Sequence, residues 1–221
     1  MCAHYEALKQ SDRLARYFGV AQVPEDARSD VWPGYRSLFL RRKTGLESAG
    51  AREGSREAVL GVFGLLPHWA KDLRFARHTY NARSETAAEK PSFREAWRKG
   101  QRCIVPAEAI YEPDWRSGKA IAARIVRRDG SPMGIAGLWS RWRGLEAEVV
   151  ESFTMLTINA DAHPFMRNYH RVGEEKRMVA ILDPGDYDAW LGEGEVPDLL
   201  RAIAPEDLIR DLAPGSDSAR T

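Results

Sequence analysis

Apolar and β-branched positions recur in short runs along the middle of the chain, separated by turn-forming residues. This pattern predicts strands at 35–42, 57–66, 102–112, 120–128, 133–143, 151–159 and 176–182. Helical spacing occurs in shorter segments, and it predicts helices within 5–19, 89–100, 184–194 and 205–214. A strand-rich middle with a few helices around it predicts an α+β fold.

The chain has no internal repeat and no linker long enough to divide it. The segment 43–55 is rich in Gly, Ser and charged residues and is expected to be a flexible loop between two strands. The last residues are polar, so we expect one domain over 1–213 and a disordered tail over 214–221. We expect this domain to act as a monomer.

The charge of the chain excludes a uniformly basic DNA-binding domain. It carries 33 basic and 32 acidic residues, a net charge of +1, so any nucleic-acid binding must use a local patch. Its only cysteines are Cys2 and Cys103, it has no secretory leader pattern, and no apolar stretch approaches about 18 residues. We therefore expect a cytoplasmic protein with reduced thiols and no membrane span.

The common sequence signatures of cofactor sites are absent. The chain has no Gly-rich phosphate loop, no GxSxG, no HExxH and no CxxC, and its five histidines are scattered. We expect no metal and no nucleotide cofactor.

Polar residues embedded in apolar segments are the candidates for chemistry. In TYNARSET (79–86), Asn81, Arg83 and Glu85 alternate, so an extended chain would place them on one face. Glu112 ends an apolar run, where burial would raise its pKa towards the range of proton transfer. His170 lies in a basic loop that precedes the last predicted strand.

The second residue of the chain offers a different chemistry. Methionine aminopeptidase removes Met1 when the next residue is small, which would leave Cys2 with a free α-amine beside its thiol. This 1,2-aminothiol can condense with an aldehyde: the amine forms an imine, and the thiol closes a thiazolidine ring.

Several of these motifs together resemble one family. In chain order, the initial MC, FGLLPHWAKD (63–72), TYNARSET, KPSFREAW (90–97), RCIVPAEAIYE (102–112) and the late KRMVAIL (176–182) resemble the SOS-response-associated peptidase (SRAP) family across nearly the whole chain. The resemblance implies a compact domain with a mainly antiparallel, barrel-like sheet and peripheral helices. It also implies covalent capture of abasic sites in single-stranded DNA through Cys2, in the DNA damage response.

Motif by motif, the resemblance assigns working residues to this chain. They are Cys2, Asn81, Arg83, Glu112 and His170. Three departures stand beside them: His4 replaces the arginine usual at the fourth position, Pro113 replaces a tryptophan, and a longer segment, RVGEEKR, separates His170 from Met178. The candidate DNA contacts are Arg83, Arg77, His4, Trp69 and Arg171.

The roles of these residues follow from the capture chemistry. Loss of hydroxyl from the carbinolamine needs an acid, which we assign to Glu112, and either Glu112 or His170 can accept the thiol proton. Asn81 would orient the sugar or the amine, and Arg83 would bind a phosphate. If the imine persists, β-elimination would give weak lyase activity.

Other interpretations of the same residues remain open. Asn81 can be a turn residue, Arg83 and Glu85 an ion pair, Glu112 a solvated carboxylate, and Trp69 a core side chain. At the level of function, the alternatives are a hydrolase or peptidase with Cys2 as its N-terminal nucleophile and a non-enzymatic module that binds single-stranded DNA. On DNA, the protein would be associated with the nucleoid.

Overall fold

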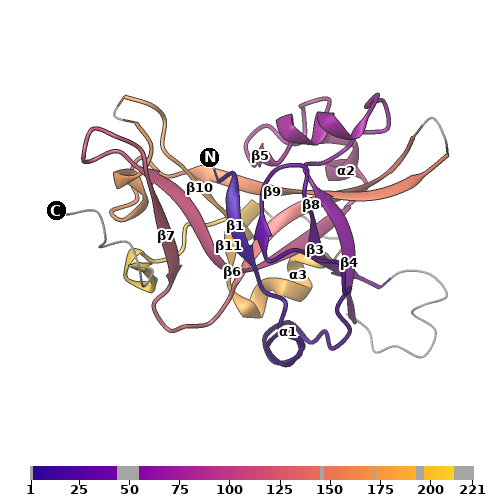
Figure 1. Cartoon of the computed structure of the whole chain (residues 1–221), viewed down its shortest axis with the longest axis horizontal. Helices are drawn as coiled ribbons and strands as arrows, with labels where there is room; N and C mark the ends of the chain where they lie inside the picture. Colours follow the sequence, from indigo (N-terminus) through magenta and orange to yellow (C-terminus); the bar gives the residue numbers. More distant parts are fainter. Residues whose placement is uncertain (1, 44–54, 145–146, 172, 193–196, 212–221) are drawn as a thin grey trace.

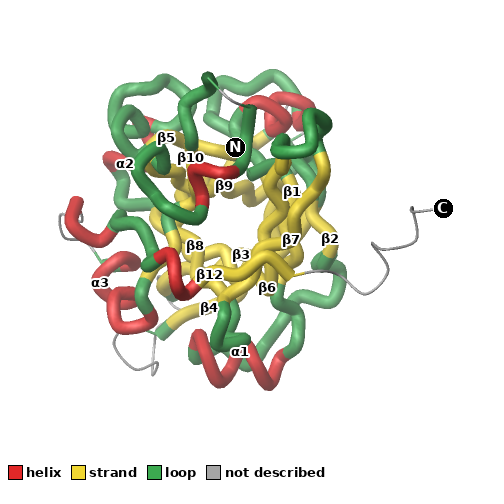
Figure 2. Tube along the Cα trace, turned by 90° about the vertical axis from the view of Figure 1, so that its left-hand side faces the viewer, coloured by secondary structure: helices red, strands yellow, loops and turns green. Residues whose placement is uncertain are grey.

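The computed structural model describes residues 2–43, 55–144, 147–171, 173–192 and 197–211. Their strands surround the centre of the molecule, and the short helices lie outside them (Figures 1 and 2). The predicted α+β class and the barrel-like sheet of a single domain are confirmed. The described strands are β1 (His4–Ala7), β2 (Asp30–Val31), β3 (Arg36–Arg42), β4 (Arg56–Phe63), β5 (Asn81–Arg83), β6 (Arg102–Asp114), β7 (Ile121–Arg127), β8 (Met133–Arg143), β9 (Val149–Asn159), β10 (Arg177–Val179), β11 (Ile181–Leu182) and β12 (Leu208–Asp211).

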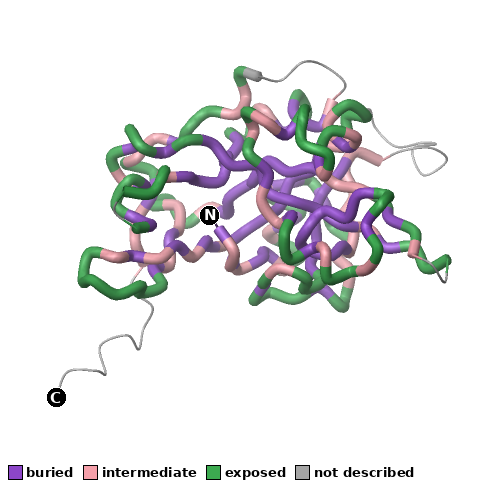
Figure 3. Tube along the Cα trace, turned by 90° about the horizontal axis from the view of Figure 1, so that it is seen from above, coloured by how far each residue is buried: buried purple, intermediate pink, exposed green. Residues whose placement is uncertain are grey.

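A closed barrel of five strands forms the core. Its order is β3–β4–β9–β8–β6, and β6 pairs with both β8 and β3 to complete the ring. All described pairings are antiparallel except β4–β9 and β5–β9, which confirms the mainly antiparallel sheet. Side chains such as Phe39, Phe63 and Phe153 are fully buried, and Figure 3 shows the buried positions gathered in the interior with exposed positions around them.

Strand β6 extends beyond the barrel and carries further strands on its second half. There it pairs with β1, His4 opposite Tyr111, and with β7, Glu112 opposite Ala123. This register brings the N-terminal segment alongside the end of β6, so Cys2 and Glu112 become neighbours although 110 positions separate them in the sequence.

Helices are short and peripheral in the described part of the chain. The α-helices are α1 (Ser11–Phe18), α2 (Arg94–Arg98) and α3 (Tyr187–Leu191). The 3-10 turns are η2 (Leu73–His78), η3 (Met166–Asn168), η4 (Pro184–Asp186), η5 (Pro197–Leu199) and η6 (Pro205–Asp207). None of the described helices is long and apolar enough to cross a membrane.

Two of the helix predictions are wrong in part. Residues 4–7 form β1, because Tyr5 and Ala7 alternate inward and the edge of β6 offers backbone partners; the helix begins only at Ser11. The predicted C-terminal helix is likewise replaced by η6 and then β12, which pairs with β7 from Leu208 to Asp211. In both places, pairing at a free sheet edge overrides a weak helical spacing.

The remaining predictions agree in the type of element and differ in extent. The helix predicted within 89–100 is only α2, and the strand predicted at 176–182 is divided into β10, which pairs with β9, and β11, which pairs with β8. β8 has the predicted bounds, while β4 stops at Phe63, because Gly64 has φ 124° and a Cβ there would lie 2.0 Å from the carbonyl oxygen of Ala76. The C-terminal tail, and the loop prediction except for its two ends, lie outside the described residues.

Candidate functional site

The site lies where the N-terminal segment meets β5, the end of β6 and the loop before β10. Cys2 is 1% exposed, and its thiol lies 3.4 Å from the carbonyl oxygen of His4. Asn81 Nδ2 donates to the carbonyl oxygen of Cys2 at 2.9 Å. Asn81 Oδ1 is also buried, and no described residue donates to it. An amide oxygen left in this state is available to a ligand.

Glu112 and His170 form the second half of the site. Glu112 Oε2 lies 3.2 Å from His170 Nε2, and that nitrogen is also 3.2 Å from the carbonyl oxygen of Arg177. Their relative exposures are 1% and 8%, so both side chains are shielded from bulk water. The structure thus brings together four sequence-predicted residues: Cys2, Asn81, Glu112 and His170.

Burial shifts the pKa of each of these groups so that its neutral form is favoured over its charged form. Burial raises the pKa of Glu112 to about 7 and lowers the pKa of His170 to about 4. The pKa of the Cys2 thiol is raised well above its usual range, first by burial and then by the nearby Glu112 charge. At neutral pH the thiol and the imidazole are therefore neutral, and Glu112 is close to half protonated.

The loop at His170 is held in an unusual backbone conformation. His170 has φ 65°, a left-handed value that is uncommon for a residue other than glycine and costs about 1–3 kcal/mol. Its N–H donates to Pro113 O at 2.9 Å, and Lys176 Nζ donates to its carbonyl at 3.2 Å. The guanidinium of Arg171 lies 4.4 Å from the ring centre of Trp115. These contacts fix the loop against the end of β6.

The predicted DNA contacts lie at different places around this centre. The His4 ring is stacked between Trp32 and Tyr111, each with its ring centre 4.1 Å away, and its Nε2 lies 2.5 Å from Asp30 Oδ1. His4 is therefore held by protein partners. Trp69 is 45% exposed, and Arg77 is exposed on η2.

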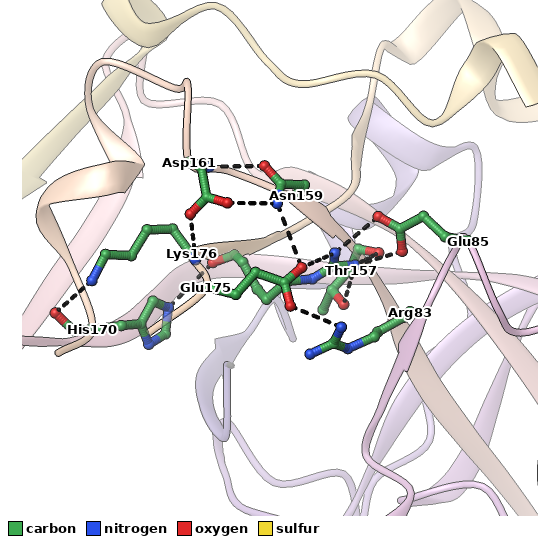
Figure 4. A network of polar contacts seen from close by, with 9 residues as sticks. Arg83, Glu85, Thr157, Asn159, Asp161, His170, Glu175 and Lys176 are labelled. Carbon is green, nitrogen blue, oxygen red and sulfur yellow. Dashed lines mark hydrogen bonds and ion pairs between the residues drawn. The ribbon is translucent and has the colours of Figure 1, made fainter. Parts of the chain in front are cut away.

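Arg83, the arginine of the TYNARSET motif, forms an ion pair with Glu175, which the sequence analysis did not predict. Arg83 Nη1 lies 2.8 Å from Glu175 Oε2, and the other oxygen of Glu175 accepts from Arg177 Nη1 at 3.0 Å (Figure 4). Arg177 also binds both oxygens of Glu85 at 2.8 Å. The suggested pair between Arg83 and Glu85 is thus replaced by Arg83–Glu175 and Arg177–Glu85.

Sequence reasoning assigned no role to Trp32 or Glu175, and it counted Arg177 only among the basic residues near His170. For Trp32 a signal existed, because Trp-Pro-Gly-Tyr (32–35) is a typical turn sequence; Gly34 has φ 89° and Tyr35 N donates to Trp32 O at 2.9 Å. Glu175 and Arg177 had no comparable signal, since their partners are distant in the sequence. Among the described residues, no group of three or more His, Cys, Asp or Glu side chains is arranged to hold a metal ion.

Comparison with known proteins identifies the family. Residues 1–210 match the sequence model described as SOS response associated peptidase (SRAP), so the chain belongs to the SRAP family. It is 34% identical over 206 residues to the Abasic site processing protein YobE of Bacillus subtilis, covering 92% of this chain and 88% of the relative. It is 31% identical over 178 residues to the Abasic site processing protein HMCES of Xenopus tropicalis, covering 68% of this chain and 51% of that protein.

Solved structures show the same fold. A crystal structure of a Bordetella bronchiseptica protein is similar with a TM-score of 0.83 and 45% identity, covering 94% of this chain and 97% of the other. A Bacteroides thetaiotaomicron protein has a TM-score of 0.73 at 22% identity, with coverages of 94% and 90%. The second likeness concerns the fold alone.

Proposed function

We propose that this protein processes abasic sites in single-stranded DNA by forming a covalent bond through Cys2. The observation that carries the proposal is the position of Cys2: Asn81 holds its carbonyl, and the charge of the buried Glu112 carboxyl acts on its thiol. Relatives that cover most of this chain are named abasic site processing proteins, which supports the choice of substrate.

In the first step, removal of Met1 leaves the α-amine of Cys2 as the nucleophile. The free amine attacks the aldehyde carbon of the open-chain sugar to give a carbinolamine. Glu112 in its protonated form donates to the departing hydroxyl, which leaves as water, and the imine forms. A carboxyl whose pKa is about 7 is suited to this step, because much of it stays protonated at neutral pH.

In the second step, the thiol closes the ring. Loss of water in the first step leaves the imine protonated on nitrogen and Glu112 ionised. The sulfur adds to the carbon of this protonated imine, whose nitrogen becomes the ring N–H, and the thiol proton passes to Glu112, so that Glu112 is regenerated and one water is released overall. The raised pKa of the Cys2 thiol keeps it protonated until Glu112 accepts that proton, which favours attack by the amine before attack by sulfur. Neutral His170 holds Glu112 in place by its contact at 3.2 Å.

The binding residues would hold the sugar in this orientation. Asn81 Oδ1 is available to accept a hydrogen bond from the Cys2 amine or a sugar hydroxyl. Arg83 lies on the same short strand and would bind a neighbouring phosphate. If the imine persists, loss of the 3′ phosphate by β-elimination gives a weak lyase activity.

The decisive experiment uses single-stranded DNA with one abasic site. Wild type should give a species that survives a denaturing gel, and Cys2→Ala should give none, while Cys103→Ala, which alters the other buried cysteine, should still form it. Mass spectrometry of the N-terminus checks that Met1 is removed. A stable crosslink formed by Cys2→Ala at the wild-type rate would refute the proposal.

The same series separates the two alternative functions. An N-terminal-nucleophile peptidase would turn over peptide substrates in a manner abolished by Cys2→Ala. A non-enzymatic binding module would bind intact and abasic DNA equally and form no covalent species. A tetrahydrofuran analogue, which lacks the aldehyde, measures binding without chemistry.

A further inference from the structure

Glu175 is placed where a ligand anion would bind. Its two carboxylate oxygens bridge two guanidinium groups, Arg83 at 2.8 Å and Arg177 at 3.0 Å. A phosphodiester also presents two anionic oxygens, and arginine recognises both groups with the same fork of N–H donors. Figure 4 shows the Glu175 carboxylate facing Arg83, in a position where it contacts the two guanidinium groups that a phosphodiester could also contact.

Arg83 and Arg177 differ in their exposure and in the number of partners they have besides Glu175. The Arg177 side chain is 4% exposed, and besides Glu175 it donates two bonds to Glu85 and one to the carbonyl oxygen of Thr157. The Arg83 side chain is 50% exposed, and Glu175 is its one ion-pair partner among the described residues. Arg83 is thus the group that Glu175 withholds from an incoming ligand.

We infer that Glu175 is an internal competitor for the DNA backbone: its carboxylate occupies the phosphate-binding position of Arg83 and must leave when single-stranded DNA binds. The inference rests on the proposed function, and it adds a residue that sets DNA affinity. Glu175 lies in the segment between His170 and Met178, and its partner Arg177 has its carbonyl oxygen 3.2 Å from His170 Nε2.

The strength of this competition is bounded by the exposure of the pair. Side chains that are 50% and 36% exposed form an ion pair worth up to about 1 kcal/mol, which corresponds to roughly a five-fold change in an equilibrium constant. The competitor therefore lowers affinity without blocking the site. Because both the ion pair and its replacement are screened by salt, the effect should be largest at low ionic strength.

The test compares Glu175→Gln with Glu174→Gln. Glu174 is the adjacent exposed carboxylate and forms no ion pair with a described residue, so its replacement removes the same charge without freeing Arg83. The probe is a single-stranded oligonucleotide with one tetrahydrofuran site, and its affinity is measured by fluorescence anisotropy at low and high salt. We expect Glu175→Gln to bind the probe roughly two- to five-fold more tightly than wild type at low salt. The affinity of Glu174→Gln should stay much closer to that of wild type.

A double-mutant cycle with Arg83→Gln identifies the mechanism. If Glu175 acts by withholding Arg83, most of the gain from Glu175→Gln should vanish when Arg83 is already absent. Equal gains from Glu174→Gln and Glu175→Gln, or a gain that persists in full with Arg83→Gln, would overturn the inference. If wild type neither binds the probe nor crosslinks to abasic DNA, the proposed function itself fails, so the two failures are distinguishable.

Discussion

Glu112 is the residue whose environment makes the clearest kinetic prediction. Glu112→Gln keeps the shape of the side chain but cannot donate or accept the proton, so crosslinking at saturating DNA should slow by roughly 10²–10⁴-fold with little loss of affinity. The wild-type rate should fall as pH rises through about 7, where Glu112 loses its proton, while protonation of the amine lowers the rate at acid pH. Single-turnover crosslinking against pH measures both effects; superimposable profiles for the two proteins would remove Glu112 from the chemistry.

The same substitution should change how stability depends on pH. The folded-state pKa of Glu112 is raised from 4.5 to about 7, so the folded protein holds a proton that the unfolded chain has lost, and stability falls as pH rises between these values. The free energy of unfolding of Glu112→Gln, measured relative to wild type, should therefore rise by up to about 3 kcal/mol as the pH increases from 4.5 to 7.5. Denaturant unfolding of both proteins at each pH gives this difference, and a constant difference would show that Glu112 is not held neutral.

At the scale of elements, the ion pair between Glu85 and Arg177 joins the turn after β5 to the start of β10. Both oxygens of Glu85 accept from Arg177, and the carbonyl of Arg177 lies 3.2 Å from His170 Nε2. Glu85→Gln should lower the free energy of unfolding by about 1–2 kcal/mol, because Glu85 is half exposed and Glu175 still binds Arg177. It should also slow crosslinking, because the Glu85–Arg177 pair connects the segment that carries Asn81 to the residue whose carbonyl oxygen contacts His170.

Glu95→Gln is the matched control for this prediction. Glu95 pairs with Lys99 and His68 on the exposed face of α2, where such contacts contribute little. Chemical denaturation and single-turnover crosslinking are measured on both variants. Equal stability losses, or a Glu85→Gln protein that crosslinks at the wild-type rate, would contradict a role for this pair in positioning the site.

The sequence predicted most elements because their apolar patterns are local. It failed at residues 4–7 and 208–211, where the edge of a neighbouring strand decides the conformation. At the site, the motifs pointed to the four residues that the structure brings together, Cys2, Asn81, Glu112 and His170. They did not predict that Arg83 pairs with Glu175 and Glu85 with Arg177. Ion-pair partners depend on the register of strands distant in sequence, and no single motif encodes that register.

At the scale of the whole molecule, closure of the barrel depends on the contact between β6 and β8. Gly137 lies opposite Cys103 in this pairing, and a Cβ at Gly137 would be 2.4 Å from the carbonyl oxygen of Thr154 and 2.9 Å from Cys103 Sγ. Gly137→Ala should therefore destabilise the fold by about 1–3 kcal/mol or more through overpacking. Gly185→Ala is the control, since nothing lies within 4 Å of its added Cβ. Thermal unfolding of both variants checks this, and equal melting temperatures would refute the tight closure.

The buried, protonated thiol of Cys2 has a consequence for survival under oxidative stress. Oxidants such as peroxide attack thiolates far faster than thiols and need access to the sulfur, and in the chain that carries Met1 the Cys2 thiol offers neither charge nor exposed surface. The same oxidants damage DNA bases and so increase the number of abasic sites. Under the proposed function, a Cys2 thiol that stays reduced in these conditions remains able to capture abasic sites when they are most abundant.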